Sequence, residues 1–298
     1  MLLALPLVWA VADDAYAALL EIGGLTLATE RASLADVVEF APTVLVSTLT
    51  DALRLAYAAS QERIDLADGP LRVAVITAEP GASLEATRRS VEDRWGATCL
   101  DVYALTELGV IGYGCEQRRG GMHLDDRELD LDVLEAESDR RVPPGVLGEL
   151  VVSTPPDWDT PLRRLRTGDL VRLRSEVCDC GRGSAWIDGG VLGRVNELLT
   201  VRGQVLLPSS IEQVARRHPA VVDFALRTYT VRREFELTVQ LEPTEALSSE
   251  SDLSRVAAEV AEDLRRTFGI RLHCEVVPPS TISSTHQPGR RARRLKRA

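Results

Sequence analysis

Strand and helix patterns alternate along the first hundred residues, and this alternation restricts the fold more than any other feature. Short β-branched or apolar runs at residues 43–47 and 71–77 predict buried strands. Amphipathic patterns at 51–61 and 83–95 predict helices between and after them, the second beginning with Ser83 as its N-cap. Because helices separate successive strands, the pattern favours a parallel sheet with helices packed on its faces.

The segment Tyr103–Cys115 follows another apolar run, Thr98–Val102, which predicts a further buried strand. Its sequence, YALTELGVIGYGC, places a hydroxyl, a carboxylate and a thiol on one glycine-punctuated turn. Thr106 and Glu107 would stand where the strand ends, and ligands of open α/β sheets collect beyond the carboxyl ends of strands. The spacing alone is equally compatible with a turn in which Thr106 caps a helix.

The pattern changes after Cys115 to short strands and turns. Runs at 129–135, 148–153 and 170–174, together with a Pro-Pro-Gly turn at 143–145, predict an antiparallel or barrel-like β region beside the parallel sheet. The first domain is therefore expected to be of the α/β class.

A second unit is predicted after Arg194, which divides the chain into a large domain, residues 1–194, and a small one, residues 195–298. Its patterns give the order βαββαβ, with the longest helix at 250–268. This order fits a compact C-terminal α+β domain.

Composition limits the partners. At 298 residues the chain can hold one large and one small domain. A net charge of −10 argues against nucleic-acid binding, the basic tail after residue 290 being the exception. The apolar run 2–20 lacks a basic start and is too short to cross a bilayer, so a core helix is predicted rather than a signal peptide or membrane anchor. With few cysteines for a chain of this size, we expect a cytoplasmic protein without a disulfide framework.

Four side chains form a candidate metal site: Cys115, His123, Cys178 and Cys180. Three thiolates and one imidazole are the ligands of a closed, tetrahedral structural zinc site. Buried free thiols are an equally good interpretation from the residues alone. Cys99 and Cys274 are expected to be small buried apolar residues.

Several motifs together resemble the phenylacetate-CoA ligase family of adenylate-forming enzymes. The most specific is Tyr103-Ala104-Leu105-Thr106-Glu107, similar to the family's Tyr-Gly-Leu-Thr-Glu signature. The others recur in the family's order: Ala78-Glu79-Pro80, Gly148–Val151, Arg166–Leu170, Cys178–Arg182, Gly193-Arg194, and Arg202-Gly203 followed by Pro208 and Ile211-Glu212. Their shared order over most of the chain identifies it as a member of this family, and related ligases carrying cysteines at similar places favour zinc over free thiols.

The resemblance implies an AMP-forming ligase that uses ATP and Mg²⁺ to activate a carboxylic acid for coenzyme A or another acceptor, in a cleft between the two domains. The implied nucleotide-site residues are Glu79 and Pro80 at the adenine wall, Tyr103, Thr106 at the α-phosphate, Asp169 at the ribose, and Arg194 at ribose and phosphate. Glu107 would hold Mg²⁺. The Gly203 loop would serve the thioester-forming step after rotation of the small domain.

The chain also departs from the family pattern. No Ser/Thr/Gly-rich phosphate loop followed by a lysine occurs in residues 1–60. Arg290 stands where the family has its catalytic lysine, and the only lysine is Lys296. Arginine keeps the charge without the compact ammonium. Asn196 and Ala104 replace an acidic hinge residue and a glycine.

Two hypotheses follow from these departures. The first is an acid-thiol ligase that is either a fragment or a naturally shortened member. The second is a degenerate homologue that does not adenylate but binds a nucleotide, an acyl carrier or a partner chain that supplies the phosphate loop. A homodimer is an open alternative for its assembly.

Overall fold

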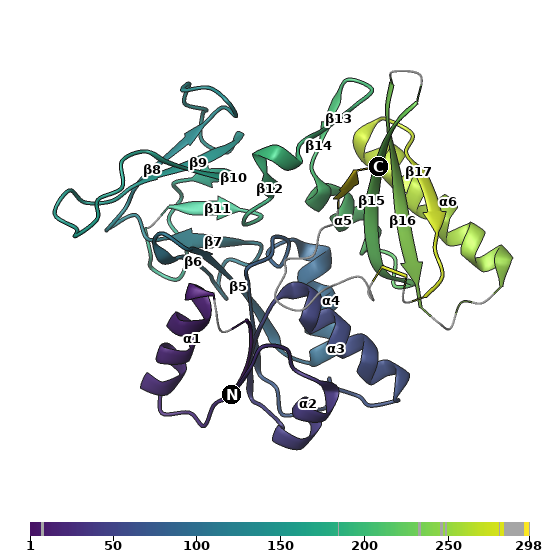
Figure 1. Ribbon diagram of the computed structural model, residues 1–298, viewed down its shortest axis with the longest axis horizontal. Helices are drawn as coiled ribbons and strands as arrows, with labels where there is room; N and C mark the ends of the chain where they lie inside the picture. The colour runs from purple at the N-terminus through teal and green to yellow at the C-terminus, as the bar shows by residue number, and fades with distance from the viewer. Residues whose placement is uncertain are drawn as a thin grey trace. The chain divides into compact units, whose positions relative to one another are not determined.

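The computed structural model describes residues 1–6, 9–183, 185–231, 234–244, 247, 249–279, 281–282 and 295–297. The chain divides into two compact units, Met1–Asn196 and Glu197–Ala298, and Figure 1 labels most of their elements. The predicted role of the small domain as a lid that rotates to bring the Gly203 loop to the active site stays a prediction.

Five parallel strands form one half of the sheet in the first unit. Their order across the sheet is β2 (Leu27–Thr29), β1 (Leu2–Ala4), β3 (Val44–Ser47), β4 (Val73–Thr77) and β5 (Thr98–Leu105). Successive side chains point to opposite faces: Leu45 lies in the core on one face, and Val46 lies in the core on the other. Both faces are therefore buried, which explains the continuous apolar runs.

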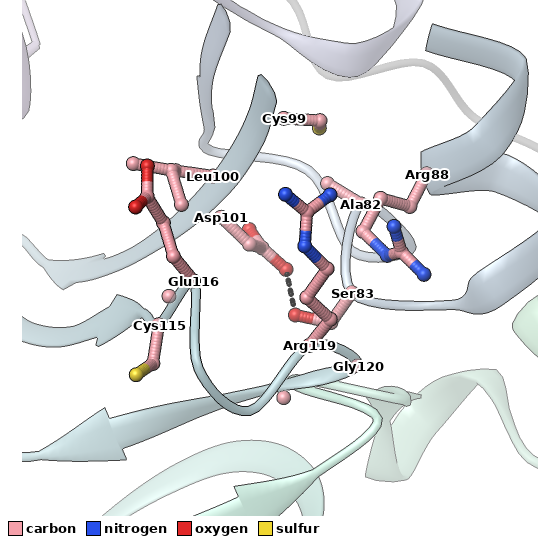
Figure 2. Close-up of a pocket in the computed structure, with 12 residues that line it drawn as sticks. Ala82, Ser83, Arg88, Cys99, Leu100, Asp101, Cys115, Glu116, Arg119 and Gly120 are labelled. Carbon is pink, nitrogen blue, oxygen red and sulfur yellow. Dashed lines mark hydrogen bonds between the residues drawn. The ribbon is translucent and has the colours of Figure 1, made fainter. Parts of the chain in front are cut away.

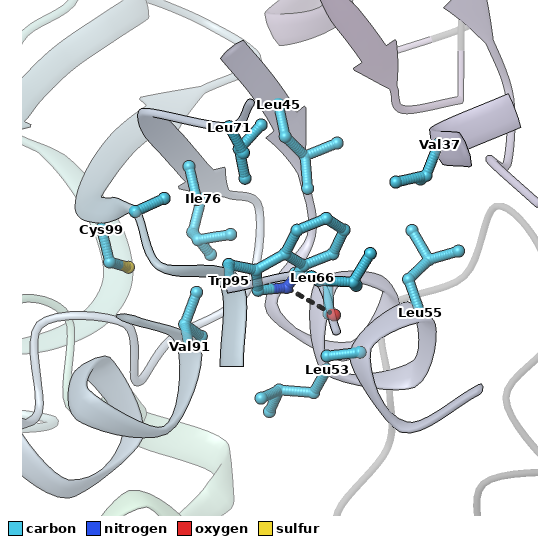
Figure 3. Close-up of a cluster of buried hydrophobic side chains, with 14 of the residues drawn as sticks. Val37, Leu45, Leu53, Leu55, Leu66, Leu71, Ile76, Val91, Trp95 and Cys99 are labelled. Carbon is cyan, nitrogen blue, oxygen red and sulfur yellow. Dashed lines mark hydrogen bonds between the residues drawn. The ribbon is translucent and has the colours of Figure 1, made fainter. Parts of the chain in front are cut away.

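Helices cover the two faces of this parallel half. Three of them, α2 (Leu34–Phe40), α3 (Leu49–Gln61) and α4 (Glu85–Trp95), contribute buried side chains to the larger core. Trp95 fills the centre of that core, and its Nε1 donates to the Ala52 carbonyl at 3.1 Å (Figure 3). Helix α1 (Ala10–Glu21) packs Ala12 and Leu19 on the opposite face.

The sheet continues beyond β5 with antiparallel strands. The order is β5, β6 (Gly109–Gly114), β7 (Gly121–Leu124), β11 (Trp186–Asp188), β10 (Leu165–Arg174), β9 (Leu147–Ser153) and β8 (Asp130–Leu134), and β12 (Gly193–Arg194) also pairs with β10. Their inward side chains form a separate core around Leu150, Val171 and Ile187. The predicted combination of a parallel layer with an antiparallel region is confirmed.

The second unit has its own core. A hairpin of β13 (Leu199–Val201) and β14 (Gln204–Leu206) precedes α5 (Pro208–Ala215), and the short 3-10 helix η1 (Val195–Glu197) precedes the hairpin. A four-stranded sheet follows, in the order β17 (His273–Val276), β16 (Glu234–Pro243), β15 (Val221–Val231) and β18 (Leu295–Arg297). Helix α6 (Glu250–Phe268) packs on it through Val256, Val260 and Leu264. The chain order from this hairpin to β17 confirms the α+β prediction.

Three local predictions are wrong. The segment 2–20 is not one helix: Leu2–Ala4 is a strand and the helix starts at Ala10, because Pro6 lies between them and a short apolar run suits a buried strand equally well. Tyr103–Cys115 is not one turn, since β6 returns along β5 as a hairpin. Ser83 does not cap α4, because Leu84 is the N-cap and the Ser83 hydroxyl bonds elsewhere. Within the described residues, no helix combines the length and apolar character needed to cross a bilayer.

Candidate functional site

The predicted phosphate and magnesium residues lie where parallel strands end. Strand β5 ends at Leu105, and Thr106 and Glu107 form the turn to β6 with both side chains exposed. Glu79 and Pro80 follow the end of the neighbouring strand β4. These positions match the edge of an open α/β sheet where ligands bind.

Glu79 has a clear structural partner. Its Oε2 accepts a hydrogen bond from the Thr50 backbone N–H in the first turn of α3, at 2.8 Å. A carboxylate at a helix N-terminus is stabilised by the unpaired N–H groups and the helix dipole. Glu79 therefore ties the segment after β4 to α3.

Tyr103, Asp169 and Arg194 form a cluster that joins distant parts of the chain. The Tyr103 hydroxyl donates to Asp169 Oδ2 at 2.7 Å, and Arg194 Nε pairs with Asp169 Oδ1 at 3.0 Å. The Tyr103 and Asp169 residues are 7% and 3% exposed, while the Arg194 side chain is 38% exposed. Burial, followed by the nearby Asp169 charge, raises the pKa of Tyr103 well above its ordinary value, so the phenol remains a donor.

The backbone that carries Asp169 is held by its own hydrogen bonds. Glu149 accepts from Arg166 Nε at 3.0 Å and from the Gly168 N–H at 3.1 Å. Thr167 Oγ1 donates to the Leu150 carbonyl and accepts from the Asp169 N–H. The pairing of β9 with β10 is irregular here, and Gly168 has a φ of +73°, which glycine adopts readily. This bulge directs the Asp169 side chain toward Tyr103.

The four predicted metal ligands come together. Cys115 follows β6, His123 lies in β7, and Cys178 and Cys180 lie on the loop between β10 and β11. Their candidate ligand atoms all lie within 4.8 Å of one another. The Sγ atoms of Cys115 and Cys178 are 3.9 Å apart, and Cys180 Sγ lies 3.4 Å from His123 Nε2.

These separations fit the chemistry of zinc. Zinc–sulfur bonds of about 2.3 Å and zinc–nitrogen bonds of about 2.0 Å in a tetrahedron place neighbouring ligand atoms about 3.5–3.8 Å apart. Trp186 packs edge-on against His123, with ring centroids 5.0 Å apart, and the Arg118 guanidinium covers the Trp186 ring. The cluster thus offers a donor set that could hold a metal ion, with two separations, 3.4 and 3.9 Å, close to those of tetrahedral zinc ligands.

Asp101 is a candidate site residue that the sequence analysis missed. It lies within β5, two residues before Tyr103, and lines a small pocket with Ser83, Arg88 and Arg119 (Figure 2). Its Oδ2 accepts from Ser83 Oγ at 2.7 Å. Burial raises its pKa from 3.8 to about 6, against the opposing effect of the Ser83 hydrogen bonds. A lone carboxylate inside an apolar strand run was the available signal.

Two predicted residues belong to the second unit. Gly203 forms the turn of the β13–β14 hairpin with a φ of +78°, a conformation that favours glycine. Arg290 lies outside the described residues. Their roles stay predictions.

Sequence comparisons identify related proteins. A family model described as the AMP-binding enzyme C-terminal domain matches residues 203–295. Phenylacetate-coenzyme A ligase of Thermus thermophilus is 29% identical over 260 residues, which are 81% of this chain and 57% of that protein. The Pseudomonas putida protein of the same name is 30% identical over 177 residues, 59% of this chain and 39% of that protein. The chain thus spans about half the length of these relatives.

Two solved structures of CoA ligases have the same fold. A 2-hydroxyisobutyryl-CoA ligase in complex with 2-HIB-AMP, in the postadenylation state, has a TM-score of 0.88 at 23% identity; the match covers 100% of this chain and 65% of that one. A benzoate CoA ligase from Burkholderia xenovorans LB400 has a TM-score of 0.69 at 18% identity, covering 93% of this chain and 57% of that one. These likenesses confirm the fold, and the sequence matches confirm the resemblance drawn from the motifs.

Proposed function

We propose, on the premise that the chain is a phenylacetate-CoA ligase-like protein, that it activates a carboxylic acid with ATP. An oxygen of the acid would attack the α-phosphorus and pyrophosphate would leave, giving an acyl adenylate. The thiolate of coenzyme A, or another acceptor, would then attack the acyl carbon and release AMP. The named relatives are phenylacetate-CoA ligases, which supports an aromatic acid as substrate.

The nucleotide would bind at the carboxyl ends of β4 and β5. Thr106 offers a hydroxyl for the α-phosphate, and the exposed carboxylate of Glu107 suits Mg²⁺, which prefers oxygen ligands. Glu79 and Pro80 would form the adenine wall. The hydrogen bond from Thr50 to Glu79 supports this assignment, because it fixes the wall to a helix instead of leaving it mobile.

The ribose would bind at Asp169. A carboxylate can accept about four hydrogen bonds, so contacts with Tyr103 and Arg194 are compatible with accepting from two ribose hydroxyls. Arg194, the most exposed member of the cluster, is suited to follow negative charge that develops near the α-phosphate. This cluster is the single observation that carries the proposal. It brings together Tyr103, Asp169 and Arg194, three predicted nucleotide-binding residues that lie far apart in the sequence.

The remaining assignments concern zinc and the second unit. Cys115, His123, Cys178 and Cys180 would hold a structural Zn²⁺, which would connect β7 to the loop after β10. Gly203 would serve transfer to the acceptor, and Arg290 would take the place of the catalytic lysine. A cytoplasmic location, a homodimer and a partner chain carrying a phosphate loop stay predictions.

The test is carboxylate-dependent exchange of pyrophosphate with ATP, together with hydroxamate trapping, over a panel of aryl and acyl acids with Mg²⁺. We expect exchange with at least one acid. Asp169→Asn should reduce it about 10- to 100-fold, because a hydrogen bond to a charged group contributes about 1.5–3 kcal/mol. Asp157→Asn, at an exposed loop position, is the matched control and should leave the rate unchanged. The absence of both pyrophosphate exchange and ATP binding in the wild-type chain would refute the proposal.

A further inference from the structure

The Tyr103 side chain is fixed in place before any ligand arrives. It lies in β5, which is paired with β4 on one side and β6 on the other. Gly112 stands opposite Tyr103 on β6, where an added Cβ would lie 3.3 Å from the Tyr103 Cβ and 2.9 Å from a Leu124 methyl group. The missing side chain at Gly112 therefore leaves the space that the tyrosine and its neighbours fill.

From this fixed ring, one hydroxyl reaches across 66 positions of sequence to Asp169. We propose that Tyr103 is a positioning residue for nucleotide binding, whose hydroxyl holds Asp169 Oδ2 so that the carboxylate faces the ribose hydroxyls in one orientation. The inference rests on the proposed function. It assigns to Tyr103 an action through Asp169 and no contact with the reacting atoms.

The two partners of Asp169 are suited to different tasks. Tyr103 is buried and neutral, whereas the Arg194 side chain is partly exposed and charged. A hydrogen bond from a phenol to a carboxylate is charge-assisted and directional. Because burial raises the pKa of Tyr103, the donor stays protonated over the range in which nucleotides are bound. The tyrosine would therefore hold Oδ2 even when Arg194 moves toward a phosphate.

Preorganisation explains why the hydrogen bond from Tyr103 to Asp169 would change the affinity for a nucleotide. A ligand that must first order a side chain loses about 0.5–1.5 kcal/mol for each rotamer-rich group that it immobilises. Tyr103→Phe keeps the ring and its packing but removes the hydroxyl that bonds Asp169 Oδ2. The carboxylate would then have to be oriented by the ligand.

The experiment compares two nucleotides in two proteins, using the whole chain and isothermal titration. Wild type and Tyr103→Phe are titrated with ATP and with 2′,3′-dideoxy-ATP, which lacks the ribose hydroxyls. We expect the variant to bind ATP about tenfold or more weakly and dideoxy-ATP with unchanged affinity. Tyr113→Phe, which removes a hydroxyl from the adjacent strand β6, should bind both nucleotides as the wild type does.

Other outcomes distinguish a failure of the positioning role from a failure of the proposed function. Equal weakening toward both nucleotides would show a general structural effect and overturn the positioning role, as would unchanged ATP affinity in Tyr103→Phe. In a double-mutant cycle, Tyr103→Phe should add nothing to Asp169→Asn, because Tyr103 acts only through Asp169; additive losses would also overturn the role. If the wild type binds no ATP, the proposed function itself fails, and the positioning role fails with it.

Discussion

Replacing Asp101 by asparagine should stabilise the protein in a way that depends on pH. Asp101 is 7% exposed, and its carboxylate accepts a hydrogen bond from the Ser83 hydroxyl at 2.7 Å. Burial disfavours the charged form, which is why the pKa rises from 3.8 to about 6. Asparagine has nearly the same shape and keeps an oxygen that can accept from Ser83, but it carries no charge.

Proton linkage gives the direction in which stability changes with pH. Between about pH 4 and pH 6 the folded protein holds a proton on Asp101 that the unfolded chain has released. Stability from this group is therefore fully present below the unfolded pKa and is lost as pH rises toward the folded pKa. One pH unit corresponds to about 1.4 kcal/mol, so a pKa that rises from 3.8 to about 6 lowers the free energy of unfolding by about 3 kcal/mol at pH 7. Asp101→Asn should match the wild type near pH 4 and exceed its stability by up to about 3 kcal/mol at pH 7.

Urea unfolding at pH 4, 5, 6 and 7 measures this difference. All four tryptophans lie in the first unit, so their fluorescence follows the unit that contains Asp101. Other groups titrate in the same range, but they affect both proteins and cancel in the difference. Asp157→Asn, which removes an exposed charge, should show no such trend. The reasoning would be refuted if the free energies of unfolding of the wild type and Asp101→Asn differed by the same amount at every pH. It would also be refuted if the variant were less stable than the wild type at pH 7.

Three further changes test other parts of the molecule. Cys178→Ser should abolish zinc binding, measured by elemental analysis, and lower the melting temperature. Cys274→Ser, outside the cluster, should retain one zinc per chain. Unchanged metal content in Cys178→Ser would contradict the ligand set. Trp95→Ala should cost about 3–5 kcal/mol in urea unfolding, because it empties the centre of the first core. Arg216→Met should cost about 3–5 kcal/mol, measured by circular dichroism, because it leaves buried carboxylates in the second unit without their cation. Arg255→Met, which breaks only exposed ion pairs, should leave the stability nearly unchanged.

The sequence predicted the parts of the fold that depend on local pattern. Alternating helical and strand periods indicated a parallel sheet, and short strands with turns indicated the antiparallel region. The first twenty residues show the limit of this approach. Leu2–Ala4 and Ala10–Glu21 are both apolar, and periodicity cannot separate a buried strand from a buried helix over so few residues.

The clustering of Cys115, His123, Cys178 and Cys180 was also predictable, because cysteine and histidine are uncommon and their chemistry is specific. Asp101 was not, since its effect depends on its environment. The local sequence predicts Ser83 as a helix cap, whereas in the structure its hydroxyl donates to the Asp101 carboxylate. The raised pKa comes from burial, which only the packed structure determines.

Sequence alone determined the class of fold, the order of the motifs and the residue types available for chemistry, because these follow from local spacing and from the side chains themselves. Tertiary structure decided which of these residues meet. Tyr103 lies on β5 and Asp169 on β10, and three other strands lie between these two in the sheet order. Their contact depends on the irregular pairing of β10 with β9, which turns the Asp169 carboxylate toward the tyrosine hydroxyl. Such contacts depend on how the whole sheet packs, and no local pattern encodes them.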